Sequence, residues 1–146
     1  MDALADFIKK HNVQAELLNT DHEVKTVQQS ADRGIDPATI IKSLLFIGEK
    51  PVLVLVRGDC RADEAKLASH YPNIHFANAN EVRKTTDYGP GDVPPLLEGA
   101  YERVMDDKVA AGTLFECGGG KEKRHLRITV KELQRVQEWK ILDVST

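Results

Sequence analysis

The chain has 146 residues and a formal net charge of -3, with 41% hydrophobic and 29% charged residues. This length predicts a single domain over residues 1–146 that can bury one hydrophobic core, and the composition excludes a disordered protein. The negative net charge argues against a protein that coats nucleic acid nonspecifically. It still allows a local basic patch that reads the end of a nucleic acid.

The sequence shows no segment that would direct the chain to a membrane. Its apolar runs fall well short of the roughly 20 residues that cross a bilayer, and the N-terminus has no basic stretch followed by an apolar one. The two cysteines, Cys60 and Cys117, lie far apart and outside any Cys-x-x-Cys pair. These features predict a reduced, cytoplasmic protein without membrane contact.

Two helices are predicted in the first quarter of the chain. Apolar residues at helical spacing predict one over residues 2–13, with Asp2 as its N-cap. Gln29 follows Thr26 by three residues, a capping-box pattern that predicts the start of the second helix. Gly34 suits the left-handed position just beyond a helix, so we expect the second helix to end near it.

The rest of the chain alternates irregularly between strands and helices. A Gly-Glu-Lys-Pro turn at residues 48–51 separates two apolar runs and predicts a β-hairpin. Thr129, with Glu132 three residues later, predicts the N-cap of the last helix. Further strands are expected over residues 14–20, 73–78, 101–107, 112–120 and 140–146, helices over 63–70 and 78–86, and a strand followed by a helix over 126–139. This order favours a mixed-sheet α/β or α+β domain.

Lys42 interrupts an apolar run that otherwise predicts a buried strand. Side chains alternate along a strand, so Lys42 shares a face with Leu44 and Phe46, and the opposite face is also mostly apolar. An unpaired ammonium group buried there would be costly in free energy. Two interpretations follow. Lys42 is either a lysine near a strand end whose head reaches water, or a lysine at the floor of a cavity that holds an anionic or carbonyl-bearing ligand.

Two glycine-containing segments are the other candidate features. In Gly89–Pro95 (GPGDVPP) the prolines fix φ and the glycines allow a positive φ, so the loop can present backbone N–H groups or serve as a rigid surface connection. The Gly118–Gly120 run is similar to a phosphate loop, but Phe115 stands where that motif needs glycine and Glu122 where it needs serine or threonine. The run therefore predicts a flexible turn or a close approach of backbone to a ligand.

Residues that could act as nucleophiles or metal ligands show no recognised pattern. Cys117 has no identifiable histidine and aspartate or asparagine partner, so we interpret it as a small strand residue. The histidines at positions 11, 22, 70, 75 and 125 lack metal-ligand spacing, and no Gly-x-Ser-x-Gly elbow is present. The sequence therefore predicts neither a metal nor a cofactor.

Four segments, in order, resemble the YbaK/EbsC-type family, which is related to the editing domain of bacterial prolyl-tRNA synthetase. They are a helix leading into a lysine-bearing strand, a strand with a Gly-Asp turn and helix, a Gly-x-x-x-Pro loop, and a glycine-rich strand end with the closing strand and helix. In this chain they span residues 25–46, 51–68, 91–95 and 116–133. The resemblance implies an α/β (α+β) domain whose mixed, mostly antiparallel sheet curls into a barrel-like core surrounded by helices.

The resemblance also implies roles for particular residues. Lys42 falls on the essential lysine of the family, and Gly91, Gly118 and Gly119 would complete the catalytic set. The other implied residues are Thr26, Asp92, Val93, Pro94, Pro95, Gly120 and His125 for substrate binding. The basic segment at residues 121–127 offers Lys121, Lys123, Arg124 and Arg127 as candidates for contacts with tRNA phosphates. Many relatives have a small or polar residue in place of Pro94, and this departure leaves open which amino acid would be removed.

The implied function is a freestanding trans-editing hydrolase that deacylates mischarged aminoacyl-tRNA, with alanine or cysteine on tRNA for proline as the expected substrates. Water would attack the ester with help from a substrate hydroxyl, backbone N–H groups would stabilise the oxyanion, and Lys42 would anchor the end of the tRNA. Prolyl-tRNA synthetase is a candidate partner. The alternative is a non-catalytic module that binds tRNA or an aminoacyl-nucleotide beside a synthetase.

Overall fold

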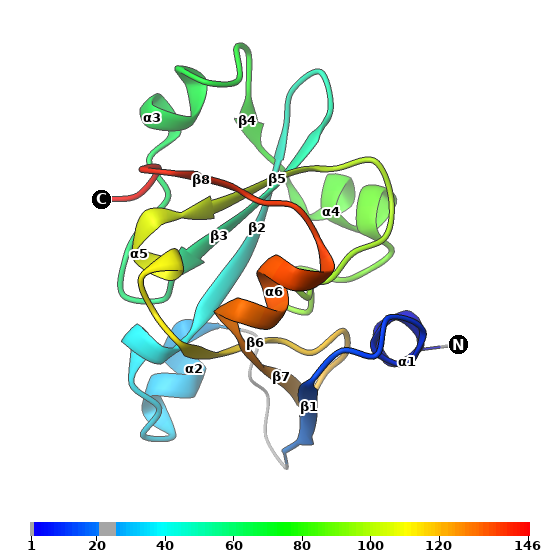
Figure 1. The fold of residues 1–146 in the computed structure, drawn as a ribbon. Coiled ribbons are helices and arrows are strands. Elements are labelled where there is room, and N and C mark those ends of the chain that lie inside the picture. The colour runs from blue at the N-terminus through cyan, green and yellow to red at the C-terminus, as the bar shows by residue number, and fades with distance from the viewer. Residues whose placement is uncertain (1, 21–25) are drawn as a thin grey trace.

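The strands form two sheets (Figure 1). The computed structural model describes residues 2–20 and 26–146, so His22 and Lys25, named in the motifs above, lie outside the described residues. The larger sheet has the order β4-β2-β3-β5-β8, with bounds His75–Phe76, Ile41–Ile47, Pro51–Arg57, Glu102–Asp106 and Lys140–Leu142. The smaller has the order β1-β7-β6, with bounds Ala15–Asn19, Arg124–Thr129 and Leu114–Gly118.

The hairpin predicted around residues 48–51 forms the centre of the larger sheet. β2 and β3 pair antiparallel along their length, and β3 is buried from Val52 to Val56, as expected for a strand covered on both faces. β5 joins β3 in parallel and β8 joins β5 in parallel, whereas β4 runs antiparallel to β2. The smaller sheet is antiparallel throughout. The mixed, mostly antiparallel pairing implied by the resemblance is confirmed.

The helices begin at the predicted capping residues. Asp2, Thr26 and Thr129 each accept a hydrogen bond from a backbone N–H group of the first turn, and Asn78 caps α4 in the same way. The helices are α1 Ala3–Lys10, α2 Val27–Asp32, the 3-10 helix η1 Pro37–Thr39, α3 Glu64–Ala68, α4 Ala79–Thr86, α5 Asp107–Ala110 and α6 Val130–Val136. The short helix α5 lies between the two strands predicted over residues 101–107 and 112–120, and the Asp106 side chain caps it. No helix in the described ranges has the length and apolar character to cross a membrane.

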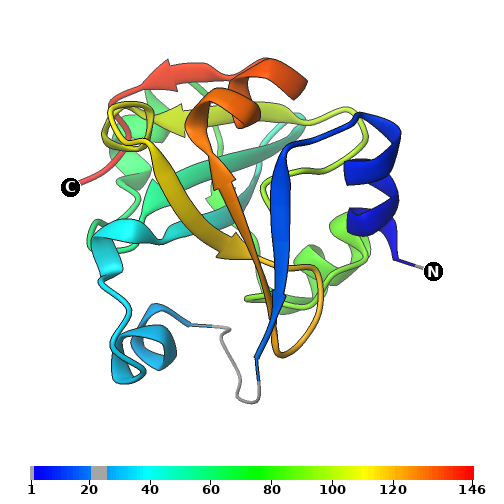
Figure 2. The same cartoon turned by 60° about the horizontal axis from the view of Figure 1, so that its bottom comes forward.

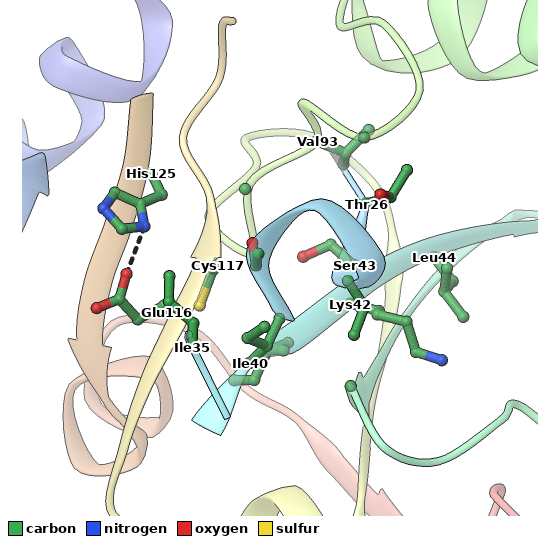
Figure 3. A pocket seen from close by; sticks show the side chains of 16 residues that line it. Thr26, Ile35, Ile40, Lys42, Ser43, Leu44, Val93, Glu116, Cys117 and His125 are labelled. Atoms are coloured by element: carbon green, nitrogen blue, oxygen red, sulfur yellow. Dashed lines mark ion pairs between the residues drawn. The ribbon is translucent and has the colours of Figure 1, made fainter. Parts of the chain in front are cut away.

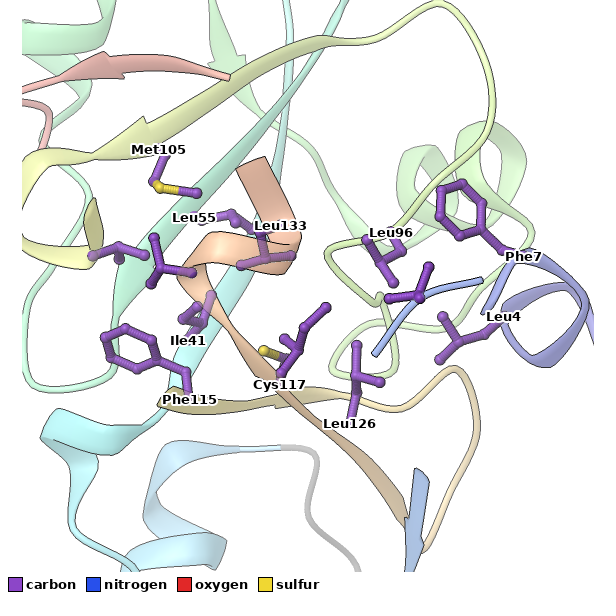
Figure 4. Close-up of a cluster of buried hydrophobic side chains, with 14 residues drawn as sticks. Leu4, Phe7, Ile41, Leu55, Leu96, Met105, Phe115, Cys117, Leu126 and Leu133 are labelled. Atoms are coloured by element: carbon purple, nitrogen blue, oxygen red, sulfur yellow. The ribbon is translucent and has the colours of Figure 1, made fainter. Parts of the chain in front are cut away.

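The largest hydrophobic core lies between the two sheets (Figure 4). Leu55 and Met105 of the larger sheet belong to one buried cluster with Leu126 of the smaller sheet. Helix α1 adds Leu4 and Phe7 to the same cluster, so the first helix of the chain packs directly against the core. The two sheets therefore cannot separate without exposing this core to water.

The barrel-like closure expected from the resemblance is wrong for the described part of the chain. The two sheets remain separate (Figure 2) and approach each other between β2 and β6 through one isolated parallel bridge, from Ile40 to Glu116. A continuous ladder would need backbone pairing beyond this bridge, and a pocket occupies that position instead. The fold is thus an α/β arrangement of two sheets, and the single domain over residues 1–146 stays a prediction.

Replacing Leu55 by alanine tests the placement of this core. Leu55 is 0% exposed, so the substitution leaves a cavity and is expected to lower the free energy of unfolding by about 2–5 kcal/mol. Urea unfolding followed by circular dichroism measures the loss. Leu114→Ala is the matched control because Leu114 is 49% exposed. A loss for Leu55→Ala no larger than that of the control would contradict the placement.

Candidate functional site

A pocket of about 370 Å³ lies where β2, the end of β6, α2 and the loop after α4 come together (Figure 3). This volume is in the range of pockets that hold small ligands or the end of a larger one. Most of the lining is apolar or backbone, and Lys42, Glu116 and His125 are its ionisable groups together with the Cys117 thiol. An apolar lining with a few polar or charged groups is typical of a binding or catalytic site.

The pocket forms because one side of β2 is left uncovered. β4 pairs with β2 at Phe46 and Ile47, and just before β2 the backbone of Ile40 bridges to Glu116. Among the described residues no strand covers the stretch between these two points on this side. The backbone and side chains of residues 41–44 therefore border the pocket, as the exposed edge of a strand can present N–H and C=O groups to a ligand.

Lys42 lies on this uncovered stretch with a half-buried side chain. Its ammonium group donates a hydrogen bond to the carbonyl oxygen of Cys60, in the turn after β3. Burial lowers the pKa of Lys42 below that of a free lysine, nearby Arg61 lowers it further, and Asp59 opposes both effects. Lys42 thus lines the pocket while its ammonium group is held by a backbone carbonyl of Cys60, which is not among the lining residues. The role of Lys42 toward a ligand stays a prediction.

The two glycine-containing segments, recognised separately in the sequence, contact each other. A Cβ atom on Gly118 would lie 2.3 Å from the carbonyl oxygen of Val93, so only glycine permits this approach. Gly120 donates a backbone hydrogen bond of 2.9 Å to the carbonyl oxygen of Asp92. Gly91 and Gly120 have φ values of 85° and 83°, which favour glycine. The loop and the end of β6 therefore form one continuous wall of the pocket.

An ion-pair network lies at the other end of the pocket. The Glu116 carboxylate pairs with the His125 imidazole and, at 2.8 Å, with the Arg127 guanidinium. Glu116 is directly opposite Arg127 in the β6–β7 ladder, and His125 is two residues away on β7, so all three side chains share one face of the smaller sheet. In Figure 3 this pair and the ammonium group of Lys42 lie on opposite sides of the lining. The pocket therefore has a cationic side and a side with a paired carboxylate.

The Cys117 thiol is unsuited to act as a nucleophile. Cys117 is buried in the core between the sheets, and burial raises the pKa of its thiol far above the usual range, with the neighbouring Glu116 carboxylate adding to the effect. A thiol with a raised pKa stays protonated near neutral pH and reacts slowly, because the thiolate is the nucleophilic form. The environment of Cys117 agrees with its interpretation as a small strand residue.

The structure brings some of the predicted substrate and catalytic residues to the pocket and leaves others behind it. The ones that line the pocket are Thr26, Lys42, Gly91, Val93, Gly118 and His125. The ones outside the lining are Asp92, Pro94, Pro95, Gly119 and Gly120, which belong to the same loop and the same glycine run. Of this second group, Pro94, Pro95 and Gly119 are buried. These positions support the wall rather than face the cavity.

The four basic residues predicted to bind tRNA lie in different environments. Lys121 and Lys123 are exposed in the turn between β6 and β7. Arg127 is partly exposed and pairs with Glu116. Arg124 is buried at 6% exposure, and both of its terminal nitrogens donate to Asp2. In this conformation Arg124 cannot also contact a phosphate.

Helix α2 and a glycine turn contribute lining residues that the sequence analysis missed. Val27 and Ser30 present one face of α2 to the pocket. They are three residues apart in the helix that Thr26 was predicted to cap, and this spacing could have indicated that they share a face. Gly58 follows β3 and lies so close to η1 that a Cβ on it would be 2.5 Å from the carbonyl oxygen of Pro37. Glu116 was also missed, although an acidic residue within the short apolar strand 114–117 is as unusual as Lys42.

One group of carboxylates lies close enough to share a cation, within the ranges that the structure describes. Asp106, Asp107 and Asp143 form it, and none of the three lines the pocket. Asp106 already accepts hydrogen bonds from the backbone N–H of Val144 and the hydroxyl of Ser145, and Asp143 pairs with a lysine. These interactions show that the group holds the end of the chain against β5.

A family model described as the aminoacyl-tRNA editing domain matches residues 21–136. The chain belongs to this family. Proline–tRNA ligase of Thermotoga maritima is 34% identical over 106 residues, which are 70% of this chain and 18% of the ligase. The same ligase of Thiobacillus denitrificans is 36% identical over 115 residues, 71% of this chain and 20% of the ligase. The chain thus spans about a fifth of the length of these curated relatives. The predicted relation to the prolyl-tRNA synthetase editing domain is confirmed.

Solved structures share the fold of the whole editing domain. The crystal structure of hypothetical protein APE2540 has a TM-score of 0.90 at 27% identity and covers 98% of this chain and 99% of that one. That of a candidate trans-editing enzyme for prolyl-tRNA synthetase has a TM-score of 0.86 at 23% identity, with 98% and 94% covered. The fold of this chain is therefore the YbaK-like fold of the resemblance, built from two separate sheets.

Replacing Gly118 by alanine tests the contact between the glycine run and the loop. Its Cβ would clash with the Val93 carbonyl oxygen at 2.3 Å, so we expect the free energy of unfolding to fall by about 1–3 kcal/mol as the wall is forced apart. Urea unfolding measures the change. The control is Gly89→Ala in the same loop, where the nearest atom would be a side-chain oxygen at 3.5 Å. Equal stability of the two variants would show that the backbone contact is not tight.

Proposed function

We propose that this editing domain is a freestanding trans-editing hydrolase that deacylates mischarged aminoacyl-tRNA, with alanine or cysteine on tRNA for proline as its substrate. One observation carries the proposal: the pocket joins Lys42 to a wall of glycine backbone in a chain of the editing family. A cation beside backbone donors suits an ester that links an amino acid to a nucleotide, because such a substrate has both a reacting carbonyl and nearby phosphate charge.

Stabilisation of the oxyanion is the chemical role proposed for the glycine wall. Ester hydrolysis passes through a tetrahedral intermediate with a negative oxygen, and each well-aimed donor contributes roughly 10²–10³ in rate. The segments 91–95 and 118–120 are the proposed donor sources, through Gly91, Val93 and Gly118, which line the pocket. The contact between Gly118 and Val93 fixes the position of one segment relative to the other. Donors held before the reaction begins need no reorganisation in the transition state.

Lys42 is proposed to anchor the end of the tRNA. Its ammonium group now donates to the Cys60 carbonyl oxygen, a neutral acceptor. A phosphate or ester oxygen that carries negative charge is a stronger acceptor, so a bound substrate can replace the carbonyl. The half-buried position makes the attraction stronger than it would be in bulk water.

Water is the proposed nucleophile, assisted by a free hydroxyl of the terminal ribose. The burial that raises the pKa of the Cys117 thiol argues against a covalent thioester intermediate. A substrate hydroxyl next to the ester can orient the water and relay its proton to the leaving ribose oxygen, so the ester C–O bond breaks to give the free amino acid and a neutral ribose hydroxyl without a protein base. Catalysis then depends mainly on positioning and on stabilisation of charge.

Selection among amino acids is proposed to depend on the size of the pocket. Apolar side chains such as Ile35, Ile40 and Leu44 border it, so a larger acyl group would be excluded by steric clash. Discrimination between two acyl groups that differ by one methylene is worth only about 1–3 kcal/mol in such a pocket. Small acyl groups, including alanine and cysteine, are therefore expected to be removed at comparable rates.

The phosphates of the acceptor stem are proposed to contact the exposed turn between β6 and β7. Lys121 and Lys123 are exposed there, and partly exposed Arg127 lies beside them on β7. Arg124 is left out of this proposal because its side chain is buried. Contacts of this kind weaken as salt rises, since counterions of the nucleic acid are released on binding. Prolyl-tRNA synthetase is the proposed partner that supplies the mischarged tRNA.

A deacylation panel tests the proposed activity. Transcripts of tRNA for proline charged with alanine, cysteine or proline are incubated with the protein, and release of the amino acid is measured over time. We expect accelerated release of alanine or cysteine and much slower release of proline. Absence of acceleration for every ester would refute the hydrolase, and tight tRNA binding in that case would favour a non-catalytic binding module.

Lys42→Ala tests the anchor. The substitution removes the cation, so deacylation is expected to fall at least about 100-fold, the scale of one lost electrostatic contact to a transition state, while the urea unfolding curve changes little. Lys50→Ala, at the exposed turn of the same hairpin, is the matched control and should retain full activity. Substantial activity of Lys42→Ala would refute the anchoring role.

A further inference from the structure

The guanidinium group of Arg124 is buried and forms hydrogen bonds with other groups of the protein. Its Nε donates to the carbonyl oxygen of Gly119 at 2.8 Å, and its terminal nitrogens donate to the two carboxylate oxygens of Asp2 at 2.6 and 3.0 Å. A buried guanidinium needs such partners, because an unpaired charge in the interior is costly. The planar fork of arginine can serve the carbonyl and the carboxylate at once, whereas the single ammonium group of a lysine cannot.

Asp2 connects this guanidinium to the first helix. The same carboxylate caps α1 by accepting a hydrogen bond of 3.2 Å from the N–H of Ala5. The Arg124 guanidinium holds the pKa of Asp2 well below its usual range, so the pair stays charged through the physiological pH range. One carboxylate therefore ties helix α1 to the start of β7, 122 residues away in the chain.

The Nε side of the Arg124 guanidinium contacts the glycine run, residues 118–120. Gly119 is the direct acceptor, and Gly120 lies against the Arg124 side chain, the Tyr88 ring and Leu4 of α1, so a Cβ there would be 3.3–3.5 Å from all three. Gly120 in turn donates to the Asp92 carbonyl oxygen. A continuous series of contacts thus runs from α1 through Arg124 and the glycine run to the loop that borders the pocket.

We infer that Asp2 and Arg124 are positioning residues for the pocket wall, and that helix α1 is a working part of the site. The carboxylate fixes the guanidinium, the guanidinium fixes the Gly119 carbonyl, and the glycine run then keeps its backbone in place against residues 91–95. We call this series of contacts, from Asp2 through Arg124 to Gly119, the brace. The matched family region begins at residue 21, so Asp2 lies outside it. The catalytic consequence rests on the proposed hydrolase, whereas the brace itself can be measured without any substrate.

Amide hydrogen exchange tests the brace. Asp2→Asn removes the charge but keeps a residue that caps helices equally well, so α1 should remain folded. Exchange at the Gly120 N–H is expected to accelerate about tenfold, the change that corresponds to one weakened charge-assisted hydrogen bond. Asp6→Asn, on the same helix and without an ion pair to any residue that the structure describes, is the matched control and should leave this exchange rate unchanged. Unchanged exchange at Gly120 in Asp2→Asn would overturn the brace.

Steady-state deacylation then tests positioning. In Asp2→Asn and in Arg124→Lys, which keeps the charge but loses the fork, kcat is expected to fall about tenfold with KM nearly unchanged, because the donors act mainly in the transition state. Asp2→Glu should recover part of the rate by restoring the carboxylate. A merely structural role would lower the fraction of folded enzyme without changing kcat per folded molecule, so rates are corrected by the unfolding curve of each variant.

The outcomes separate the two claims. A wild-type protein that releases no amino acid refutes the hydrolase, and the exchange rate of Gly120 still decides the brace. Faster exchange with an unchanged kcat in both variants would leave a structural tie and overturn the positioning role. Faster exchange together with the lower kcat, and with partial rescue by glutamate, supports it.

Discussion

The site depends on the close approach of two stretches of backbone, at the end of β6 and in the loop after α4. Gly118 and Val93 come so near that no side chain fits between them, and this contact turns two loose segments into one wall. Without it the loop would be one of the Gly- and Pro-containing connections that often move independently of a fold. A rigid wall matters for the proposed chemistry because donors stabilise an oxyanion only when they are already aimed.

The opposite wall exists because β2 is paired incompletely. Its partner β3 is buried on both faces, so that side of β2 is fixed, while the side toward β6 is open between Ile40 and Phe46. An open edge within a sheet usually invites pairing with another strand. Here α2 and the glycine wall cover it, which leaves a cavity rather than an exposed ladder. The lysine that looked misplaced in an apolar strand lies on this open stretch.

Local features of the sequence predicted much of this fold, and long-range ones predicted little of it. Caps at Asp2, Thr26 and Thr129 could be read because a few neighbouring residues determine them. The separation of the two sheets could not be predicted from the sequence, since it depends on which strand edges meet in space. Arg124 shows the same limit. Its position in a basic stretch suggested phosphate binding, and only the fold brings Asp2 beside it.

The pairing of basic side chains in residues 121–127 also affects how the domain could recognise RNA. Arg124 is neutralised by Asp2 and Arg127 by Glu116, so two of the four cations near the glycine run already have carboxylate partners. With a net charge of -3 over the chain, long-range attraction to a polyanion is weak. Under the proposed function, affinity for a tRNA then comes from short-range contacts at its end. The substrate would be distinguished by what enters the pocket, as the proposed editing reaction requires when correctly charged tRNA is in large excess.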